Sequence, residues 1–429
     1  MKKRYLPALL LTLLSTEISA QRLLVSITIE ELNAGKMEAA SRRGTSESFR
    51  RMMEQAVVYT NAAYAAMPAD HTSAIAVAAT GAAPELNGVT GSRWFDRERL
   101  RPIECTADGT PQALTCATLG DELKVETDGK ALVFGLARRR DAAIMHAGHA
   151  ANAAIWQDEK SGKWRTSDYY AKDGLKWLQA FSALNGVAAD NDALVKLALQ
   201  CIDSNMMGGD EVCDLLALHL ENDDYGRLDH TLATLIKGVE SRVGAGRVVF
   251  SIAGTTGAEG GIDSDTYRRY RIPTGTFYIN RTGELLNMFL GATYGRNQYV
   301  EGYFRNQIFL HRKLLEQRRI NRQELYERCR EFLTDCDGVS RVKTSADVLP
   351  PRSGDIVVEL MPGWSLVNEN TGDKVNYRTA AASTPIVIMG AGIKPQRITS
   401  PVTIDRLAPT LAGCIHIRAP NAATSQSLF

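Results

Sequence analysis

The 429-residue sequence lacks a hydrophobic run long enough to cross a membrane. The apolar stretch near the N-terminus ends at Leu14, well short of the roughly 20 residues that a transmembrane helix needs. An excess of charge of one sign is also missing, because 50 Lys and Arg residues face 49 Asp and Glu residues. This balance gives no indication of nucleic acid or anionic lipid as a partner. We therefore predict a protein with no transmembrane segment that binds no nucleic acid.

The cysteines lack the C-x-x-C spacing that zinc and redox sites use. Six of the seven instead fall into three local pairs, which are Cys105 with Cys116, Cys201 with Cys213, and Cys329 with Cys336. We predict a disulfide for each pair, which suits an oxidising compartment, and buried reduced thiols are the alternative. Cys414 lies in an apolar stretch and is expected in the core.

The first 20 residues read as an export signal. Met1 is followed by three basic residues, an apolar run to Leu14 and a small-residue exit at Ser19 and Ala20. This order is typical of a secretory signal peptide. We therefore predict a signal peptide over residues 1–20 and a mature protein that is periplasmic or associated with the outer membrane.

Strand-like and helix-like segments alternate along the rest of the chain. Strands are expected over residues 22–29, 57–61, 132–135, 215–220, 247–252 and 385–390, and helices over residues 46–54, 72–80 and 404–411. The strand segments are apolar throughout, which is typical of strands buried on both faces. The alternation predicts an α/β fold with a mostly parallel sheet sandwiched by helices.

The pattern changes over residues 275–348 to strand, helix, two strands, helix and strand. This order is that of a small ferredoxin-like α+β unit. We therefore place an inserted subdomain there, within one large domain that spans residues 21–429.

A series of short motifs resembles one known family. They are LLVSITI (23–29), TGAAP (80–84), WFD (94–96), LGDEL (119–123), AGH (147–149), FRNQI (304–308) and RSGD (352–355). Their order and spacing are similar to those of the bacterial periplasmic alkaline phosphatases with a threonine nucleophile, within the alkaline phosphatase and nucleotide pyrophosphatase superfamily. The resemblance covers residues 21–429 and implies the alkaline phosphatase-like fold.

The resemblance also implies a phosphate-ester hydrolase with two zinc ions, in which Asp and His side chains bind metal and an activated hydroxyl attacks phosphorus. The first metal-binding Asp of the family corresponds to Glu30 here. The nucleophilic threonine, three residues after Pro68, corresponds to His71. Thr72 or Ser73 takes that place only if the loop is shifted, and otherwise Asp70, Thr72 and Ser73 cap a helix.

The remaining metal ligands of the family fall on residues that do not suit zinc. The loop that carries an Asp and a His after the strand at 215–220 is missing, because residues 221–225 lead directly into a helix. The family's Asp-His-Gly step corresponds to Gly254, Thr255 and the residue that follows. Its last histidine corresponds to Ser383. We therefore predict no metal cofactor.

The phosphate-contacting Lys-x-Arg pair of the family corresponds to Arg139 and Asp141. A carboxylate at this place is expected to repel phosphate. Among the other candidates, His146 and His149 are predicted to be structural. The glycine-rich segment 257–261 lacks the Gly-Lys-Ser/Thr of a phosphate loop and is interpreted as a remodelled loop.

The sequence thus favours a catalytically inactive alkaline phosphatase-like protein that serves as a binding or scaffolding component of the cell envelope, with a protein partner there. A divergent phosphomonoesterase or phosphodiesterase with a rebuilt site, using Glu30, His71 or Thr72, is the alternative. A carbohydrate-binding or sulfatase-like surface protein rests on analogy of fold alone. The sequence leaves the partner and the oligomeric state open.

Overall fold

The computed structural model of the chain describes residues 21–65, 70–171, 175–184, 190–222, 224–255, 264–347, 352–376 and 383–429. The strands of its main sheet are β1 (Leu23–Glu30), β2 (Val57–Ala63), β5 (Val133–Ala137), β6 (Ala153–Gln157), β7 (Trp164–Arg165), β8 (Asp214–Leu220), β9 (Val248–Thr255), β17 (Thr384–Gly390), β18 (Gln396–Ile398) and β19 (Val402–Thr403). Nine of them follow the order β18-β2-β17-β9-β1-β8-β5-β6-β7, and β19 pairs with β2. Strands β9, β1, β8, β5 and β6 run parallel, whereas β17 is antiparallel to β9 and β2. The predicted α/β class with a mostly parallel sheet is confirmed.

The sequence of β1 explains why helices cover both faces of this sheet. Leu23, Val25 and Ile27 pack into one hydrophobic cluster, whereas Leu24 packs into another. Side chains alternate between the two faces of a strand, so the two clusters lie on opposite sides of the sheet. A strand that is buried on both faces therefore needs helices on both sides.

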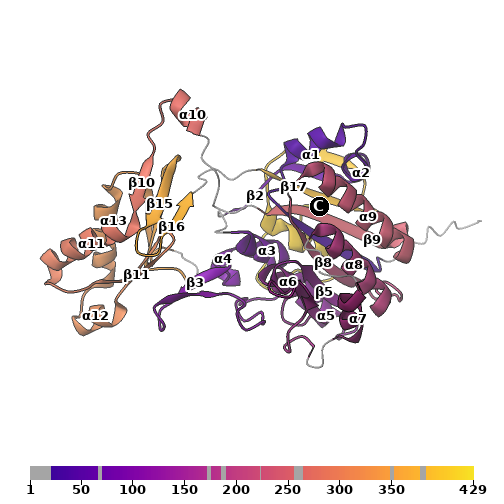
Figure 1. Cartoon of the computed structure of the whole chain (residues 1–429), viewed down its shortest axis with the longest axis horizontal. Helices are drawn as coiled ribbons and strands as arrows, with labels where there is room; N and C mark the ends of the chain where they lie inside the picture. Colours follow the sequence, from indigo (N-terminus) through magenta and orange to yellow (C-terminus); the bar gives the residue numbers. More distant parts are fainter. Residues whose placement is uncertain are drawn as a thin grey trace, which may run out of the picture.

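Two sets of helices supply these layers (Figure 1). The first cluster is completed by α1 (Ala34–Ser41), α2 (Ser48–Gln55), α7 (Lys176–Leu184), α8 (Asn191–Asn205) and α9 (Tyr225–Val243). The second is completed by α3 (His71–Thr80), α5 (Leu119–Glu126), α6 (Arg140–Ala147) and α14 (Leu407–Cys414). No helix among the described residues is long and apolar enough to cross a membrane.

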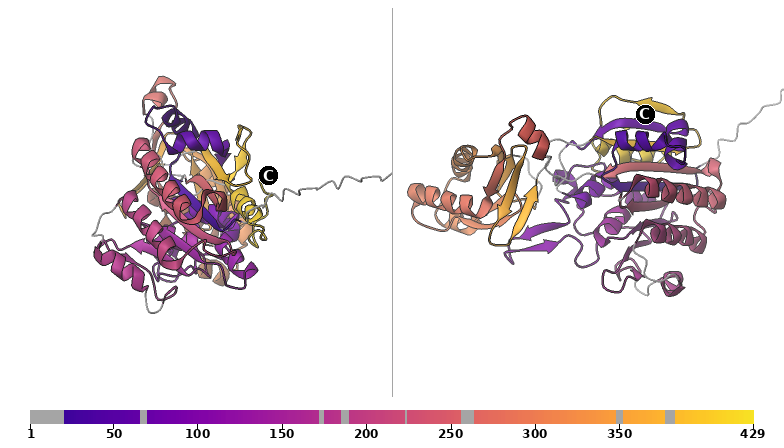
Figure 2. Two further views of the ribbon diagram at one scale, coloured as in Figure 1. Left: turned by 90° about the vertical axis from the view of Figure 1, so that its right-hand side faces the viewer. Right: turned by 45° about the horizontal axis from the view of Figure 1, so that its top comes forward.

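A smaller lobe lies beside the large one (Figures 1 and 2). Its strands are β10 (Gly275–Tyr278), β11 (Val300–Phe304), β12 (Gln307–Leu310), β13 (Val339–Thr344), β14 (Ile356–Leu360), β15 (Trp364–Asn368) and β16 (Asp373–Asn376). They form a four-stranded sheet in the order β11-β12-β14-β13 and a three-stranded sheet in the order β10-β15-β16. The helices of this lobe are α10 (Ser264–Arg269), α11 (Ile279–Tyr294), α12 (Arg312–Gln317) and α13 (Arg322–Thr334).

The pairing in this lobe differs from the ferredoxin-like arrangement predicted for residues 275–348. That arrangement joins its four strands in one sheet, whereas here β10 pairs with β15 in a sheet of its own. The pairing differs because three strands that follow residue 348 join the two sheets. β14 lies between β12 and β13, and β15 and β16 complete the sheet that contains β10. The lobe therefore continues to Asn376.

A hairpin of the large lobe, β3 (Arg93–Asp96) with β4 (Arg101–Glu104), joins the two lobes. The Phe95 ring packs against the fully buried Phe309 of β12, with 4.5 Å between ring centroids. Beside it, Arg97 Nη2 lies 2.7 Å from Oδ2 of the buried Asp355. Apolar and ionic contacts therefore both hold the smaller lobe in place.

The predicted disulfides are absent, since all seven cysteines lie in described segments and all are free thiols. Cys201 and Cys213 pack against opposite faces of the main sheet. Cys329 lies in α13, and Cys336 follows the end of that helix by two residues. Seven residues of helix span about 10 Å, beyond the roughly 7 Å that a disulfide can bridge between Cα atoms. Burial also raises the pKa of the Cys116 thiol to about 11.

Some predictions concern segments outside the described residues. These are the signal peptide at 1–20, Pro68 and the glycine-rich segment 257–261. They remain predictions.

Candidate functional site

The candidate site lies at the carboxyl end of the central strands. β1 pairs in parallel with β8 on one side and with β9 on the other, so the three strands end at the same edge of the sheet. Glu30 is the last residue of β1 and stands opposite Thr255, the last residue of β9. The N-termini of α3 and α6 bring His71, Thr72 and Asp141 to this edge.

A chain of buried polar groups leads to Glu30. The Thr28 hydroxyl lies 2.7 Å from His146 Nε2 and 2.9 Å from His219 Nδ1. The other ring nitrogen of His219, Nε2, lies 3.4 Å from Glu30 Oε1. Burial, with a smaller effect of nearby His219, lowers the pKa of His146 to about 3, so His146 is neutral at pH 7.

Glu30 is an ionised carboxylate within this network. Burial alone raises the pKa of Glu30, but the hydrogen bond to His219 and the nearby charges of His219, His71 and Arg139 outweigh burial and lower it. Arg139 Nη1 lies 3.9 Å from Glu30 Oε1. A guanidinium therefore stands beside this carboxylate.

Arg139, Asp141 and Thr72 form a second group next to Glu30. Arg139 donates to both carboxylate oxygens of Asp141, at 3.1 and 2.5 Å, and the Thr72 hydroxyl donates to Asp141 Oδ2 at 2.6 Å. The backbone N–H of Ala142, in the first turn of α6, donates to Asp141 Oδ1 at 2.9 Å. Burial tends to raise the pKa of Asp141, but Arg139 and these donors lower it. Asp141 is therefore a weak base and does not activate the Thr72 hydroxyl effectively.

His71 is held on the other side of Glu30. Its Nδ1 lies 3.0 Å from the Thr255 hydroxyl, which in turn lies 3.4 Å from the Ile29 carbonyl oxygen. Burial lowers the pKa of His71, although Glu30 opposes this effect. Glu30, His71 and Thr255 thus lie together at this edge of the sheet.

Gly254 and Ser383 serve the packing of the sheet edge. A Cβ atom at Gly254 would lie 1.8 Å from Thr384 Oγ1, so only glycine fits this position. The Gly254 carbonyl accepts a hydrogen bond from Tyr64 at 3.0 Å. The Ser383 hydroxyl donates to Asn61 Oδ1 at 2.8 Å.

The start of α3 is built as a capping box. Asp70 accepts from the Ser73 N–H at 3.1 Å, and the Ser73 hydroxyl lies 3.2 Å from the Asp70 N–H. The prediction that these two residues cap the helix is confirmed. Thr72 differs, because its hydroxyl donates to Asp141 instead. Arg305 of the smaller lobe also reaches Asp70, at 3.4 Å.

These residues do not fit a two-zinc centre. A zinc ion in a catalytic site needs about three protein ligands. The described residues contain no group of three or more His, Cys, Asp and Glu side chains placed to hold a metal ion. Glu30 and His219 are close enough to share an ion, but the guanidinium of Arg139 beside them would repel a cation. The connection where the resemblance implies a loop with two metal ligands is short, since β8 ends at Leu220 and α9 begins at Tyr225.

Thr28 and His219 were not among the site residues expected from the sequence. They stand opposite each other in the register of β1 and β8, and each is a polar residue near the carboxyl end of its strand. That pattern was the available signal. His149 lies outside the site, as predicted, where it contacts Asp121 at 3.0 Å.

A cavity of about 790 Å³ opens beside Arg139 and Asp141. Charged residues of both signs line it, together with the nearly buried ring of Trp156. The charged residues are Arg93, Glu104, Asp108, Arg139, Arg140, Asp141, Asp158, Glu159, Lys160 and Arg165. Its size is in the range of small-molecule sites, which is about 300–1,000 Å³.

Known proteins resemble this chain over nearly its whole length. Alkaline phosphatase PafA from Elizabethkingia meningoseptica is 21% identical, over 95% of this chain and 94% of its own length. A Myroides odoratus protein named calcium-transporting ATPase is 22% identical, over 95% of this chain and 94% of its own length. The crystal structure of wild-type PafA matches with a TM-score of 0.80 at 20% identity, over 95% of this chain and 98% of that one.

The structural match confirms the alkaline phosphatase-like fold. The model of a protein family, type I phosphodiesterase / nucleotide pyrophosphatase, matches residues 24–384. Because this match spans most of the sequence, the chain belongs to the type I phosphodiesterase / nucleotide pyrophosphatase family.

Proposed function

We propose that this protein is a catalytically inactive member of its family, an exported pseudoenzyme that binds or scaffolds other components of the cell envelope. The observation that carries the proposal is the ion pair between Arg139 and Asp141. In the family this place contacts the phosphate of the substrate. Here the protein's own carboxylate takes the hydrogen bonds that a phosphate would accept.

The surroundings of Asp141 support this assignment. Arg139, Thr72 and the N–H of Ala142 all donate to it, which is the donor set that an anion at a helix N-terminus attracts. A phosphate placed there would lack these donors and would face a second negative charge. The pair therefore disfavours binding of the substrate class of the family.

The lack of a fitting zinc site supports the proposal as well, because it concerns activation of the nucleophile and the leaving group rather than phosphate binding. A phosphate-ester hydrolase of this kind uses its metal ions to lower the pKa of the attacking hydroxyl and to bind the leaving oxygen. Around Glu30 the positive charge is that of the Arg139 guanidinium, and the rings of His71 and His219 lie nearby. None of these groups offers an open coordination position.

The cavity beside Asp141 supports retention of a binding role. Its lining alternates positive and negative side chains around Trp156. Such a surface suits a polar ligand or a peptide segment that carries both charges better than it suits a simple anion. The export signal expected at residues 1–20 supports a role in the cell envelope.

A turnover assay tests the proposal. Purified protein is assayed with aryl phosphate monoesters and diesters, with and without added zinc, and PafA serves as the positive control. We expect no turnover above that of a blank purification. Turnover that is lost on Glu30→Gln or Thr72→Ala substitution would contradict the proposal and support a divergent hydrolase with a rebuilt site.

A further inference from the structure

Two helices of the smaller lobe carry more apolar surface than the core of that lobe uses. Helices α11 and α13 lie on the side of the lobe away from the large one (Figure 1). Their inner sides pack into the hydrophobic core, where Leu286 of α11 and Leu333 of α13 are fully buried. On the outer side of α11, Leu285 is 50% exposed and Met288 is 64% exposed. Packing within the lobe therefore does not account for these two side chains.

The exposed side chains belong to one continuous face. Leu285 lies one turn before Met288 and Phe289, so the three side chains are neighbours on the surface of α11. The half-buried ring of Phe289 stacks on that of Phe332 in α13, with 5.0 Å between ring centroids and 26° between ring planes. We call these four residues the α11–α13 face. An apolar cluster that stays exposed after folding is typical of an interaction site.

The edge of this face on the α13 side is acidic. Glu331, Asp335 and Asp337 are exposed, and no ion pair joins any of them to another of the described residues. Cys336 follows Phe332 by one turn, and its thiol lies 3.5 Å from the Phe332 carbonyl oxygen. Burial, followed by the charges of Asp335 and Asp337, raises the pKa of Cys336, so both carboxylates are close to it. The α11–α13 face is therefore bordered by uncompensated negative charge.

The arginines of the two helices are already paired with acidic residues. The pairs are Arg281 with Glu369, Arg322 with Glu316, Arg328 with Glu324, and Arg330 with both Glu327 and Asp347. Neither helix contains a lysine. The helices therefore supply no cation of their own to the acidic edge, and a partner that docks there is expected to be basic.

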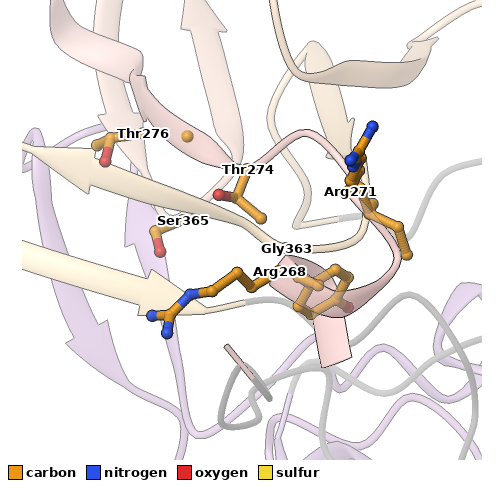
Figure 3. Close-up of a pocket in the computed structure, with 9 residues that line it drawn as sticks. Arg268, Arg271, Thr274, Thr276, Gly363 and Ser365 are labelled. Carbon is orange, nitrogen blue, oxygen red and sulfur yellow. The ribbon is translucent and has the colours of Figure 1, made fainter. Parts of the chain in front are cut away.

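A hollow on the other side of the smaller lobe has the opposite charge. Thr276 of β10 lines this hollow, whereas the next residue, Phe277, points into the core together with the inner side of α11. The basic residues of the hollow are Arg268 and Arg271, which point to opposite ends of it (Figure 3). None of its described lining residues is acidic. A basic partner is disfavoured there, so these arginines provide a control for the location of binding.

We propose that the α11–α13 face binds a basic amphipathic helix of a protein partner. The apolar stripe of such a helix covers Leu285, Met288 and the two Phe rings, while Lys or Arg side chains beside the stripe pair with the acidic edge. A second copy of this chain fits less well, because a symmetric contact would bring the same carboxylates together. The face lies apart from the cavity beside Asp141, so this binding does not depend on whether the Glu30 site is inactive.

A synthetic peptide tests the proposal in a fluorescence anisotropy titration with the purified protein. The probe is a helical peptide of about 18 residues that contains only leucine and lysine, with the leucines at helical spacing. A second peptide has glutamate in place of each lysine. We expect the lysine peptide to bind saturably, more weakly as salt is added, and at least about tenfold more tightly than the glutamate peptide.

Two double variants locate the binding on the α11–α13 face. Leu285→Ser/Met288→Ser removes the two exposed apolar side chains, and Glu331→Lys/Asp335→Lys reverses two charges of the acidic edge. Each variant should bind the lysine peptide about tenfold more weakly than the wild type does. Because all four residues are exposed, both variants should fold, and thermal unfolding of each variant checks this.

The matched controls make the same changes at exposed residues of the large lobe, and they are Val125→Ser/Leu184→Ser and Glu54→Lys/Glu211→Lys. Both should bind the lysine peptide like the wild type. Arg268→Gln/Arg271→Gln, in the basic hollow, should bind it no more weakly than the wild type.

The proposal is overturned if the lysine peptide does not bind saturably, if the glutamate peptide binds as tightly, or if the controls weaken binding as much as the two face variants. Two further results would also overturn it, by giving the face to another occupant. One is a concentration-dependent dimer of the wild type that is lost in Leu285→Ser/Met288→Ser. The other is binding to phosphatidylcholine vesicles that is lost in the same variant.

Discussion

Replacement of Asp141 by alanine should turn a closed site into an anion-binding site. The substitution removes the carboxylate but leaves Arg139, the Thr72 hydroxyl and the N–H of Ala142 as donors around the vacated position. Alanine suits the first turn of α6, so the helix should persist. Phosphate or sulfate can then accept the hydrogen bonds that Asp141 accepts in the wild type.

The magnitude follows from the charge that is removed. Two negative charges about 4 Å apart repel by about 4 kcal/mol at an effective dielectric constant of about 20, and by about 1 kcal/mol in water. The side chain of Asp141 is 14% exposed and that of Arg139 is 38% exposed, so solvent screens part of this repulsion. We therefore expect phosphate to bind Asp141→Ala about tenfold to a hundredfold more tightly than the wild type.

Titration of both proteins with inorganic phosphate measures this difference. Asp141→Asn is the matched control, because it removes the charge but keeps the side-chain volume in the position that the anion would occupy. It should gain less affinity than Asp141→Ala. The reasoning is refuted if Asp141→Ala folds normally and binds phosphate no more tightly than the wild type, or if an additional Arg139→Gln substitution leaves the gained binding unchanged.

Three further predictions concern stability. Phe309→Ala should lower the free energy of unfolding by about 3–5 kcal/mol, because this ring is fully buried against Phe95. The control, Phe429→Ala, changes a residue that is 59% exposed and should alter the free energy of unfolding by less than about 0.5 kcal/mol. Chemical denaturation measures both variants, and equal effects would contradict the packing of Phe309 against Phe95. The hydrogen bond to Asp121 raises the pKa of His149 above 6.5, so the bond stabilises the fold below about pH 6.5 and this contribution is lost as the pH rises through the raised pKa. His149→Gln should remove that pH dependence of the free energy of unfolding, which we expect to be under about 1 kcal/mol because the His149 side chain is 38% exposed. If the pH profile of the variant equals that of the wild type, the pair of His149 and Asp121 is not the source of the pH dependence. Titration with a thiol reagent should find seven free thiols per chain in protein that is denatured without reductant. A reducing agent should not shift the unfolding temperature. A count of fewer than seven thiols would support the predicted disulfides instead.

The main sheet could be predicted from the sequence because its central strands consist mostly of apolar and β-branched residues. Both β1 and β8 were expected within one residue of their observed bounds, and their burial on both faces is a local property of the pattern. The smaller lobe was predicted less well. Its pairing depends on β14, β15 and β16, and short strands with partly exposed faces carry a weaker signal.

Only those parts of the site that are formed by residues close together in the sequence could be predicted. The capping residues Asp70 and Ser73 were predicted, since a capping box is a local motif. The contact between Glu30 and His219 was not, because it joins residues 189 positions apart through the register of two strands. The disulfide prediction failed for a related reason, as spacing along the chain does not reveal which face of a sheet a thiol occupies.

The metal content of the protein purified from its native compartment tests the central claim most directly. We expect less than stoichiometric zinc, with no change in content in Glu30→Gln or His219→Gln. One or two tightly held zinc ions per chain that are lost in these variants would contradict the claim, because they would show that Glu30 and His219 complete a metal centre despite the guanidinium beside them.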